Sequence, residues 1–120
     1  MPFYPGFFLL SLFAVTPVCA DQVEVVKASV TSAGPHRYNV SVTLRHHDSG
    51  WEHYADKWEV LGEDGHVYGT RILLHPHVEE QPFTRQLDNI EIPAKVRAVT
   101  IRAHDSVHGH GPQVLSIPLP

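Results

Sequence analysis

The sequence is almost free of sulfur, with one cysteine and one methionine among 120 residues. Both lie in the first twenty positions, as Cys19 and Met1. Without residues 1–20, the remaining 100 residues have no disulfide, no thiolate nucleophile and no sulfur ligand for a metal. The stability of this part of the chain must therefore come from packing.

Basic residues are also few. Nine lysines and arginines stand against thirteen aspartates and glutamates, which gives a net charge of −4. This balance argues against nucleic acid as a partner, because nucleic-acid-binding domains carry a basic surface. The sequence also lacks a G-x-S-x-G nucleophile elbow, an H-E-x-x-H metalloprotease motif and a phosphate-binding glycine loop. We therefore expect a protein that is not an enzyme.

The one long apolar run is FFLLSLFAV, from Phe7 to Val15. It is too short for a membrane-spanning helix, which needs roughly 20 apolar residues. The residues Val18-Cys19-Ala20 fit a signal-peptidase site that cuts before Asp21. No lysine or arginine precedes the run, which departs from the usual signal peptide. A lipid anchor on Cys19 and a retained membrane anchor are the alternatives.

The pattern therefore predicts a signal peptide at residues 1–20 and a single domain at residues 21–120. We expect a periplasmic or secreted protein with no stable membrane anchor after cleavage. A protein partner in the cell envelope fits this location.

Strand signals dominate residues 21–120. From Tyr38 to Leu44, apolar and polar residues alternate strictly, which is typical of a half-buried strand. Asp64-Gly65 predicts a two-residue hairpin turn, and a change of parity at Asp88-Asn89 predicts a turn or bulge. About seven short strands and no helix result. We expect an antiparallel β-sandwich of the immunoglobulin or fibronectin type III class, with Trp58 buried on the third strand.

Histidine is abundant, and all ten histidines lie after residue 21. The segment HPHVEEQPF carries His75 and His77 on either side of a proline. Because residues i and i+2 of an extended chain point to the same side, these two imidazoles predict a metal site. The alternative is a polar loop between the two sheets.

A second cluster, RAHDSVHGHG, holds His104, His108 and His110. Its two glycines allow the loop to fold around an ion, and Asp105 stands beside His104 as a residue that could orient an imidazole. The alternative is a solvent-exposed loop.

A third cluster, RHHDSGWEHYADKW, contains His46, His47 and His53. Asp48, Ser49 and Gly50 supply a bend between the first pair and His53. The alternative is that Trp51 and Tyr54 cap the end of the core. In an immunoglobulin-like sandwich the loops bearing these clusters lie at one end, so we expect the histidines to gather there.

Three sequence motifs resemble those of a known family. They are W-x-H-Y-A-D-x-W from Trp51 to Trp58, H-P-H-x-x-E-Q-P-F-T-R from His75 to Arg85, and R-A-H-D-S-V-H-G from Arg102 to Gly109. With them, the chain resembles an uncharacterised family of small secreted bacterial proteins over most of its length. The resemblance implies a bacterial envelope setting and brings no activity.

The leading hypothesis is an exported β-sandwich that binds a divalent transition metal, zinc or copper, without catalysis. The expected ligands are His53, His75, His77, His104, His108 and His110. The alternative is a metal-free, immunoglobulin-like interaction module of the periplasm. A third hypothesis uses the histidines as proton-binding groups, because their ordinary pKa of about 6.5 lies near physiological pH.

Overall fold

A computed structural model describes residues 22–120, so the predicted signal peptide and Cys19 lie outside the described residues. The described part contains eight strands and no helix. They are β1 (Glu24–Gly34), β2 (Arg37–Arg45), β3 (Ala55–Leu61), β4 (Val67–Ile72), β5 (Phe83–Glu91), β6 (Ala98–Asp105), β7 (Gly109–His110) and β8 (Leu115–Pro118). Between residues 22 and 120 there is thus no apolar helix that could span a membrane.

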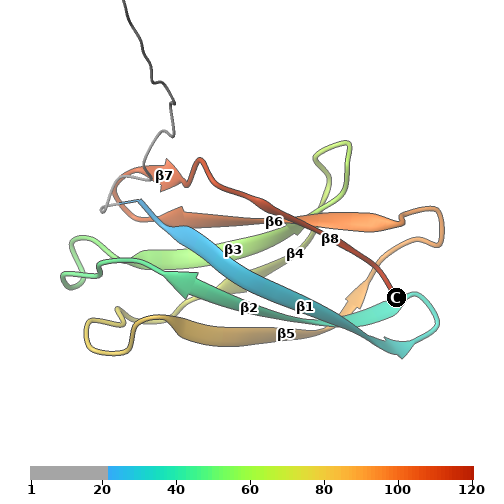
Figure 1. Ribbon diagram of the computed structural model, residues 1–120, viewed down its shortest axis with the longest axis horizontal. Coiled ribbons are helices and arrows are strands. Elements are labelled where there is room, and N and C mark those ends of the chain that lie inside the picture. The colour runs from blue at the N-terminus through green and yellow to red at the C-terminus, as the bar shows by residue number, and fades with distance from the viewer. Residues whose placement is uncertain (1–21) are drawn as a thin grey trace, which may run out of the picture.

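The strands form two antiparallel sheets (Figure 1). One sheet has the order β1-β2-β5. The other has the order β4-β3-β6-β7, and β8 also pairs with β6. In an immunoglobulin sandwich, strands A, B and E share one sheet and strands C, F and G share the other. The strands β1, β2, β5 and β3, β6, β8 divide in the same way, with β4 paired to β3. The predicted β-sandwich is confirmed.

The core lies between the sheets and is built from alternating residues. On β2, Val40, Val42 and Leu44 face inward, as the alternation from Tyr38 to Leu44 predicts. On β6, Val99, Ile101 and Ala103 do the same. Trp58 on β3 has no exposed surface, which confirms its predicted place in the core.

The β3–β4 hairpin is confirmed, but the predicted two-residue turn is wrong. The N–H of Gly62 donates to the carbonyl of His66, and the N–H of Gly65 donates to the carbonyl of Gly62. Three residues therefore separate the paired ends, and Gly65 has a φ of 87°. This is the pattern of a type I turn followed by a left-handed glycine, which the Asp-Gly pair satisfies as well as a shorter turn.

The change of parity on β5 is a bulge. The pairing between β2 and β5 shifts between Tyr38 and Val40, and Asn89 on β5 has a φ of 59°. Asparagine tolerates this left-handed conformation better than most residues. The bulge turns Ile90 toward the core after Leu87, as the sequence predicted.

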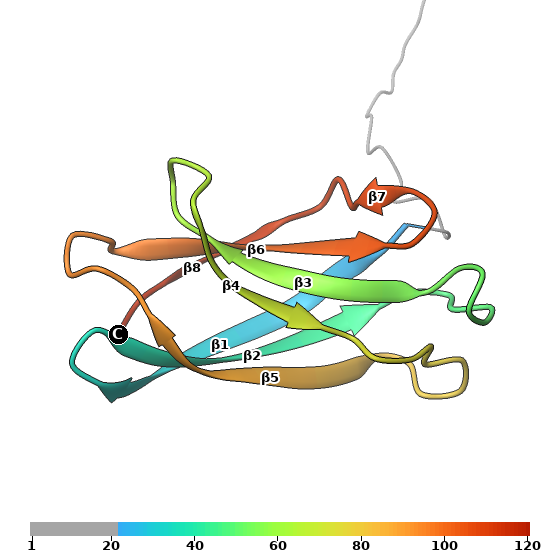
Figure 2. The same cartoon turned by 180° about the vertical axis from the view of Figure 1, so that it is seen from behind.

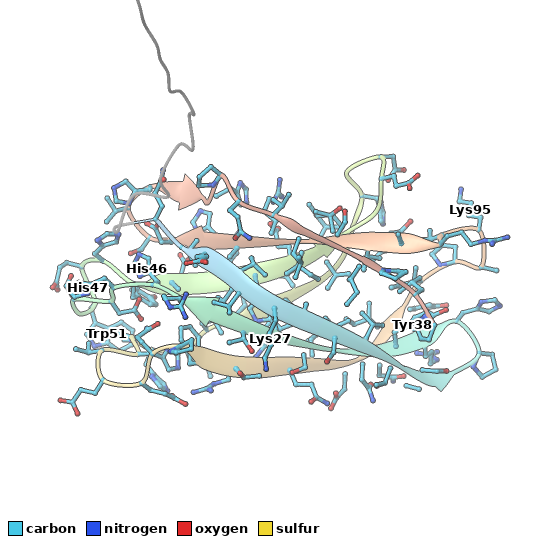
Figure 3. All side chains as sticks on the ribbon, viewed as in Figure 1. Lys27, Tyr38, His46, His47, Trp51 and Lys95 are labelled. Atoms are coloured by element: carbon cyan, nitrogen blue, oxygen red, sulfur yellow. The ribbon has the colours of Figure 1, made fainter. Side chains whose placement is uncertain are left out.

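Three loops meet at one end of the sandwich (Figures 1 and 2). They are residues 46–54 between β2 and β3, residues 73–82 between β4 and β5, and residues 106–108 between β6 and β7. Figure 3 shows His46, His47 and Trp51 at this end, and Tyr38 and Lys95 at the opposite end. The expected gathering of the histidine-bearing loops is therefore present. We call this end the histidine pole.

Candidate metal centre

Two core-facing rows of side chains end in polar residues at the histidine pole. The row Val42–Leu44 on β2 continues one step to His46, and the row Ile101–Ala103 on β6 continues to Asp105. Both the His46 and Asp105 side chains are fully buried. His46 Nε2 lies 3.9 Å from Asp105 Oδ2. The two strands thus place an imidazole and a carboxylate face to face at the end of the core.

The loop between β2 and β3 brings His53 to the same place. The N–H of Ser49 donates to the carbonyl of His53, and the N–H of His53 donates to the carbonyl of Gly50. Gly50 has a φ of 136°, which favours glycine, so the predicted bend is confirmed. The turn carries the His53 ring to 4.7 Å from the His46 ring, centre to centre.

His108 approaches the same carboxylate from the loop after β6. Asp105 Oδ1 accepts the N–H groups of Val107 and His108, at 2.9 and 2.7 Å, and so shapes its own loop. The imidazole Nδ1 of His108 then lies 3.3 Å from Asp105 Oδ1. The rings of His108 and His53 are 4.9 Å apart. Three imidazoles therefore surround one buried carboxylate.

The two oxygens of Asp105 differ. Oδ1 accepts two backbone N–H groups, whereas Oδ2 is buried and has no hydrogen-bond partner among residues 22–120. His53 Nε2 is also buried without such a partner in this range, since its 3.3 Å approach to Asp105 lacks hydrogen-bond geometry. A buried carboxylate oxygen without a donor is costly, and a cation beside it would offset the cost.

Burial alone would raise the pKa of Asp105. The backbone N–H groups of His108 and Val107, together with the His46 and His108 rings, outweigh this effect and hold the pKa below its ordinary value. Asp105 is therefore a carboxylate at neutral pH, and it brings negative charge to the centre of the cluster.

Asp48 supports His46 from the other side. Its Oδ1 bonds to His46 Nδ1 and accepts the N–H of Ala55 at 3.1 Å, and its Oδ2 accepts the N–H of His77 at 2.6 Å. Burial would raise the pKa of Asp48, but these bonds lower it below its ordinary value. A carboxylate on Nδ1 directs Nε2 of the same ring at the metal in many metalloproteins.

One ligand atom each from His46, His53 and Asp105 lies within 4.8 Å of the others. Ligand atoms 2.0–2.1 Å from a metal in tetrahedral geometry lie roughly 3.4 Å apart, so a small contraction of this cluster would close it on an ion. These three residues, which we call the inner cluster, could therefore hold a metal ion. His108 lies beside them, with its Nδ1 3.3 Å from Asp105 Oδ1.

The HPHVEEQPF segment has a different neighbourhood. The buried ring of His77 stacks on Phe83, and its Nε2 lies 3.0 Å from a guanidinium nitrogen of Arg85. Burial, Arg85 and His75 lower the pKa of His77. His75 is exposed, and its Nδ1 contacts the carbonyl of Pro76. The structure thus places the His75 and His77 rings together, 4.7 Å apart, but outside the inner cluster.

His104 and His110 lie on the opposite face of β6 from Asp105. His104 Nδ1 is 2.6 Å from Asp56 Oδ1, and His110 Nε2 is 3.1 Å from Glu59 Oε1. Of the six expected ligands, the structure therefore brings His53 and His108 together around Asp105 and places the other four elsewhere.

Sequence analysis missed His46 and Asp105 as ligands. The signal that could have found them is the period of two: each residue continues an apolar row by one further step of two residues. A polar residue at such a position faces the core end and needs a partner there.

The chain is 41% identical over 96 residues to a protein of Halomicrobium mukohataei described as "Putative lipoprotein", and the aligned part covers 80% of this chain and 47% of the relative. The chain thus spans about half the length of this relative. It matches no family profile and no solved structure. The similarity fits the uncharacterised family expected from the sequence.

Proposed function

We propose that this chain is an exported β-sandwich protein that binds a divalent transition metal, zinc or copper, at the inner cluster and does not catalyse a reaction. The observation that carries the proposal is the buried oxygen Oδ2 of Asp105. It lacks a donor among residues 22–120 and lies opposite the Nε2 atom of His46.

The donor set selects the class of metal. Two or three imidazoles and one carboxylate are ligands of intermediate softness, which suit Zn²⁺ and Cu²⁺. Residues 22–120 contain no cysteine and no methionine, so a thiolate or thioether site for Cu⁺ cannot form there. Copper(II) should bind more tightly than zinc at the same ligands, as the general order of divalent-metal affinities requires.

Export is supported by two independent observations. The first twenty residues read as a signal peptide, and the relative from Halomicrobium mukohataei is described as "Putative lipoprotein". We place the protein in the periplasm or outside the cell. A role in holding or passing on a metal fits this location and the absence of a nucleophile motif in the sequence.

Thermal unfolding of the exported protein tests the proposal. A metal at 100 times its Kd adds about 2.7 kcal/mol to the free energy of unfolding. Each kcal/mol raises the Tm of a domain of this size by about 4–8 °C. We expect Zn²⁺ and Cu²⁺ to raise the Tm of the protein, and His53→Gln and Asp105→Asn to lose most of this increase.

His47→Gln is the matched control, because His47 is an exposed imidazole in the same loop. It should keep the full increase. The proposal fails if saturating metal leaves the Tm of the folded protein unchanged. It also fails if His53→Gln and His47→Gln respond to metal alike.

A metal-free interaction module is the second candidate, and exposed apolar side chains favour it. Trp51 is 66% exposed and Leu74 is 74% exposed, and both lie in loops of the histidine pole. Val78 and Val107, in the same loops, are also exposed. Such side chains are enriched where proteins bind one another. If the protein is such a module, Trp51→Ser should reduce its chemical cross-linking to an envelope protein, whereas added metal should leave the cross-linking unchanged.

A further inference from the structure

The histidines that lie outside the inner cluster include a pair on the outer face of the second sheet. His104 on β6 and His110 on β7 are directly opposite each other in the antiparallel pairing. Side chains of opposite residues on one face of such a pair come within a few ångströms of each other. Because successive residues of a strand point to opposite faces, His104 faces away from the core, whereas Asp105 faces into it.

Each of these two rings has a carboxylate on one nitrogen. Asp56 Oδ1 lies 2.6 Å from His104 Nδ1, and Glu59 Oε1 lies 3.1 Å from His110 Nε2. A carboxylate accepts the N–H of a neutral imidazole, so the lone pair is left on the other nitrogen. Both rings are therefore oriented as a metal ligand is oriented, in the same manner as His46 by Asp48.

The spacing of the rings fits one shared ion. Two imidazoles bound tetrahedrally to a metal at 2.0–2.1 Å have ring centres roughly 5 Å apart. The centres of His104 and His110 are 5.0 Å apart, and the rings are inclined at 75°. The ring centres are thus as far apart as those of two imidazoles bound to a single cation.

The charged groups beside the pair are two carboxylates, Asp56 and Glu59, and two cations, Arg102 and Lys57. Arg102 donates two hydrogen bonds to Glu59 and so neutralises one carboxylate. Asp56 remains as a second negative group beside His104. Burial and the Arg102 charge lower the pKa of His110.

We infer that His104 and His110 form a second, exposed site for a divalent transition metal, with Asp56 and Glu59 as the groups that orient them. The His104 and His110 side chains are 25% and 42% exposed. Solvent therefore completes the coordination, and the ion binds more weakly and exchanges faster than at the buried inner cluster. The chain then takes up two metal ions, one on each face of β6.

Calorimetric titration of the exported protein with Cu²⁺ tests the second site. We expect two ions per chain, bound with different affinities. His104→Gln together with His110→Gln should remove the weaker step and leave the tighter one. Asp56→Asn, which keeps both imidazoles but loses the carboxylate that orients one of them, should weaken this step by about 10–100-fold.

The matched control is His36→Gln together with His66→Gln. This variant also removes two exposed imidazoles, but they lie in the Gly34–Arg37 and Leu61–Val67 turns, away from the histidine pole. Both steps should be unchanged. The second site is ruled out if no binding step depends on His104 and His110. That is the outcome if the variant of both residues, folded by circular dichroism, binds as many ions as the wild type.

The inner cluster and the second site fail separately. If His53→Gln loses the tight step and keeps the weak step, both the inner cluster and the second site are supported. If only the weak step is present, and it depends on His104 and His110, the second site stands and the inner cluster does not. If only a tight step is present, and it depends on His53, the inner cluster stands and the second site does not.

Discussion

His46 and Asp48 are bonded to each other through Nδ1 and Oδ1, and neither side chain has any exposed surface. The same carboxylate accepts the N–H groups of Ala55 and His77. It therefore ties the end of β2 to the start of β3 and to the loop that follows β4. A bond that orients the candidate ligand His46 thus also holds the histidine pole together.

Asp48→Asn should lower the affinity of the inner cluster for Zn²⁺ by about 10–100-fold, the usual cost of losing a carboxylate that orients a metal-bound histidine. Asparagine has one acceptor oxygen in place of two. That oxygen cannot face His46 Nδ1 and at the same time accept the N–H of His77. Competition titration with a zinc chelator measures the change. Asp88→Asn, on the exposed part of β5, is the control and should leave the affinity unaltered. Equal affinities in the two variants would contradict this role of Asp48.

The metal-free protein should become less stable as the pH falls below about 6.5, in part because of His77. Burial, Arg85 and His75 lower the pKa of this ring in the folded state. The unfolded chain, with an ordinary histidine pKa of about 6.5, then binds a proton that the folded protein resists. The contribution of His77 is complete above that pH and is lost as the pH falls toward the lowered pKa.

Urea denaturation at pH 7.5 and 5.5 in the presence of a chelator measures this effect. His77→Gln should show a smaller difference in the free energy of unfolding between the two pH values than the wild type. The comparison uses the difference and not the absolute stability, because the variant also loses the stacking on Phe83. His36→Gln, an exposed ring, should behave as the wild type does. A steeper pH dependence in His77→Gln would refute the assignment.

The fold follows from patterns that the sequence displays locally. The alternation on β2 and β6, the Asp-Gly hairpin and the change of parity on β5 each reflect a residue's own backbone preference or its need for burial. The length of the β3–β4 turn did not follow, because Asp64-Gly65 suits both a two-residue turn and a three-residue turn. Pairing at the strand ends decides between them.

The candidate site could be predicted only in part, because its residues are brought together by pairing across the two sheets. The histidine pole followed from topology, and His53 and His108 followed from their loops. His46 and His47 are neighbours and point to opposite sides of an extended chain, and His47 is the exposed one. The alternation of β2 continues past Leu44, and this decides which of the two histidines faces inward. Asp105 stands beside His104 in the sequence, but it faces the other side of β6, toward the rings of His46 and His53.

Gln81 should stabilise the loop after β4, because its side chain joins two segments of the histidine pole. Its Oε1 accepts the N–H of His46 at 2.9 Å, and its Nε2 donates to the carbonyl of His77 at 2.8 Å. Gln81→Ala leaves both groups without this partner and should cost about 1–3 kcal/mol in urea denaturation. Gln86→Ala, at an exposed position of β5, should change stability by no more than about 0.5 kcal/mol. Comparable losses in both variants would show that the bridge contributes nothing particular.

Gly111 should not tolerate a side chain, because it packs against the backbone where the chain enters β1. A Cβ at this position would lie 2.5 Å from the carbonyl oxygen of Val23, and the N–H of Gly111 donates to the carbonyl of Ala103. Gly111→Ala should therefore lower the free energy of unfolding by about 1–3 kcal/mol, as overpacking usually does. Gly69→Ala is the comparison, because the closest atom to its Cβ would be the flexible end of Leu87, at 2.9 Å, and not backbone. If Gly69→Ala is the more destabilising of the two in thermal denaturation, the close approach of Gly111 to Val23 is not a constraint on this fold.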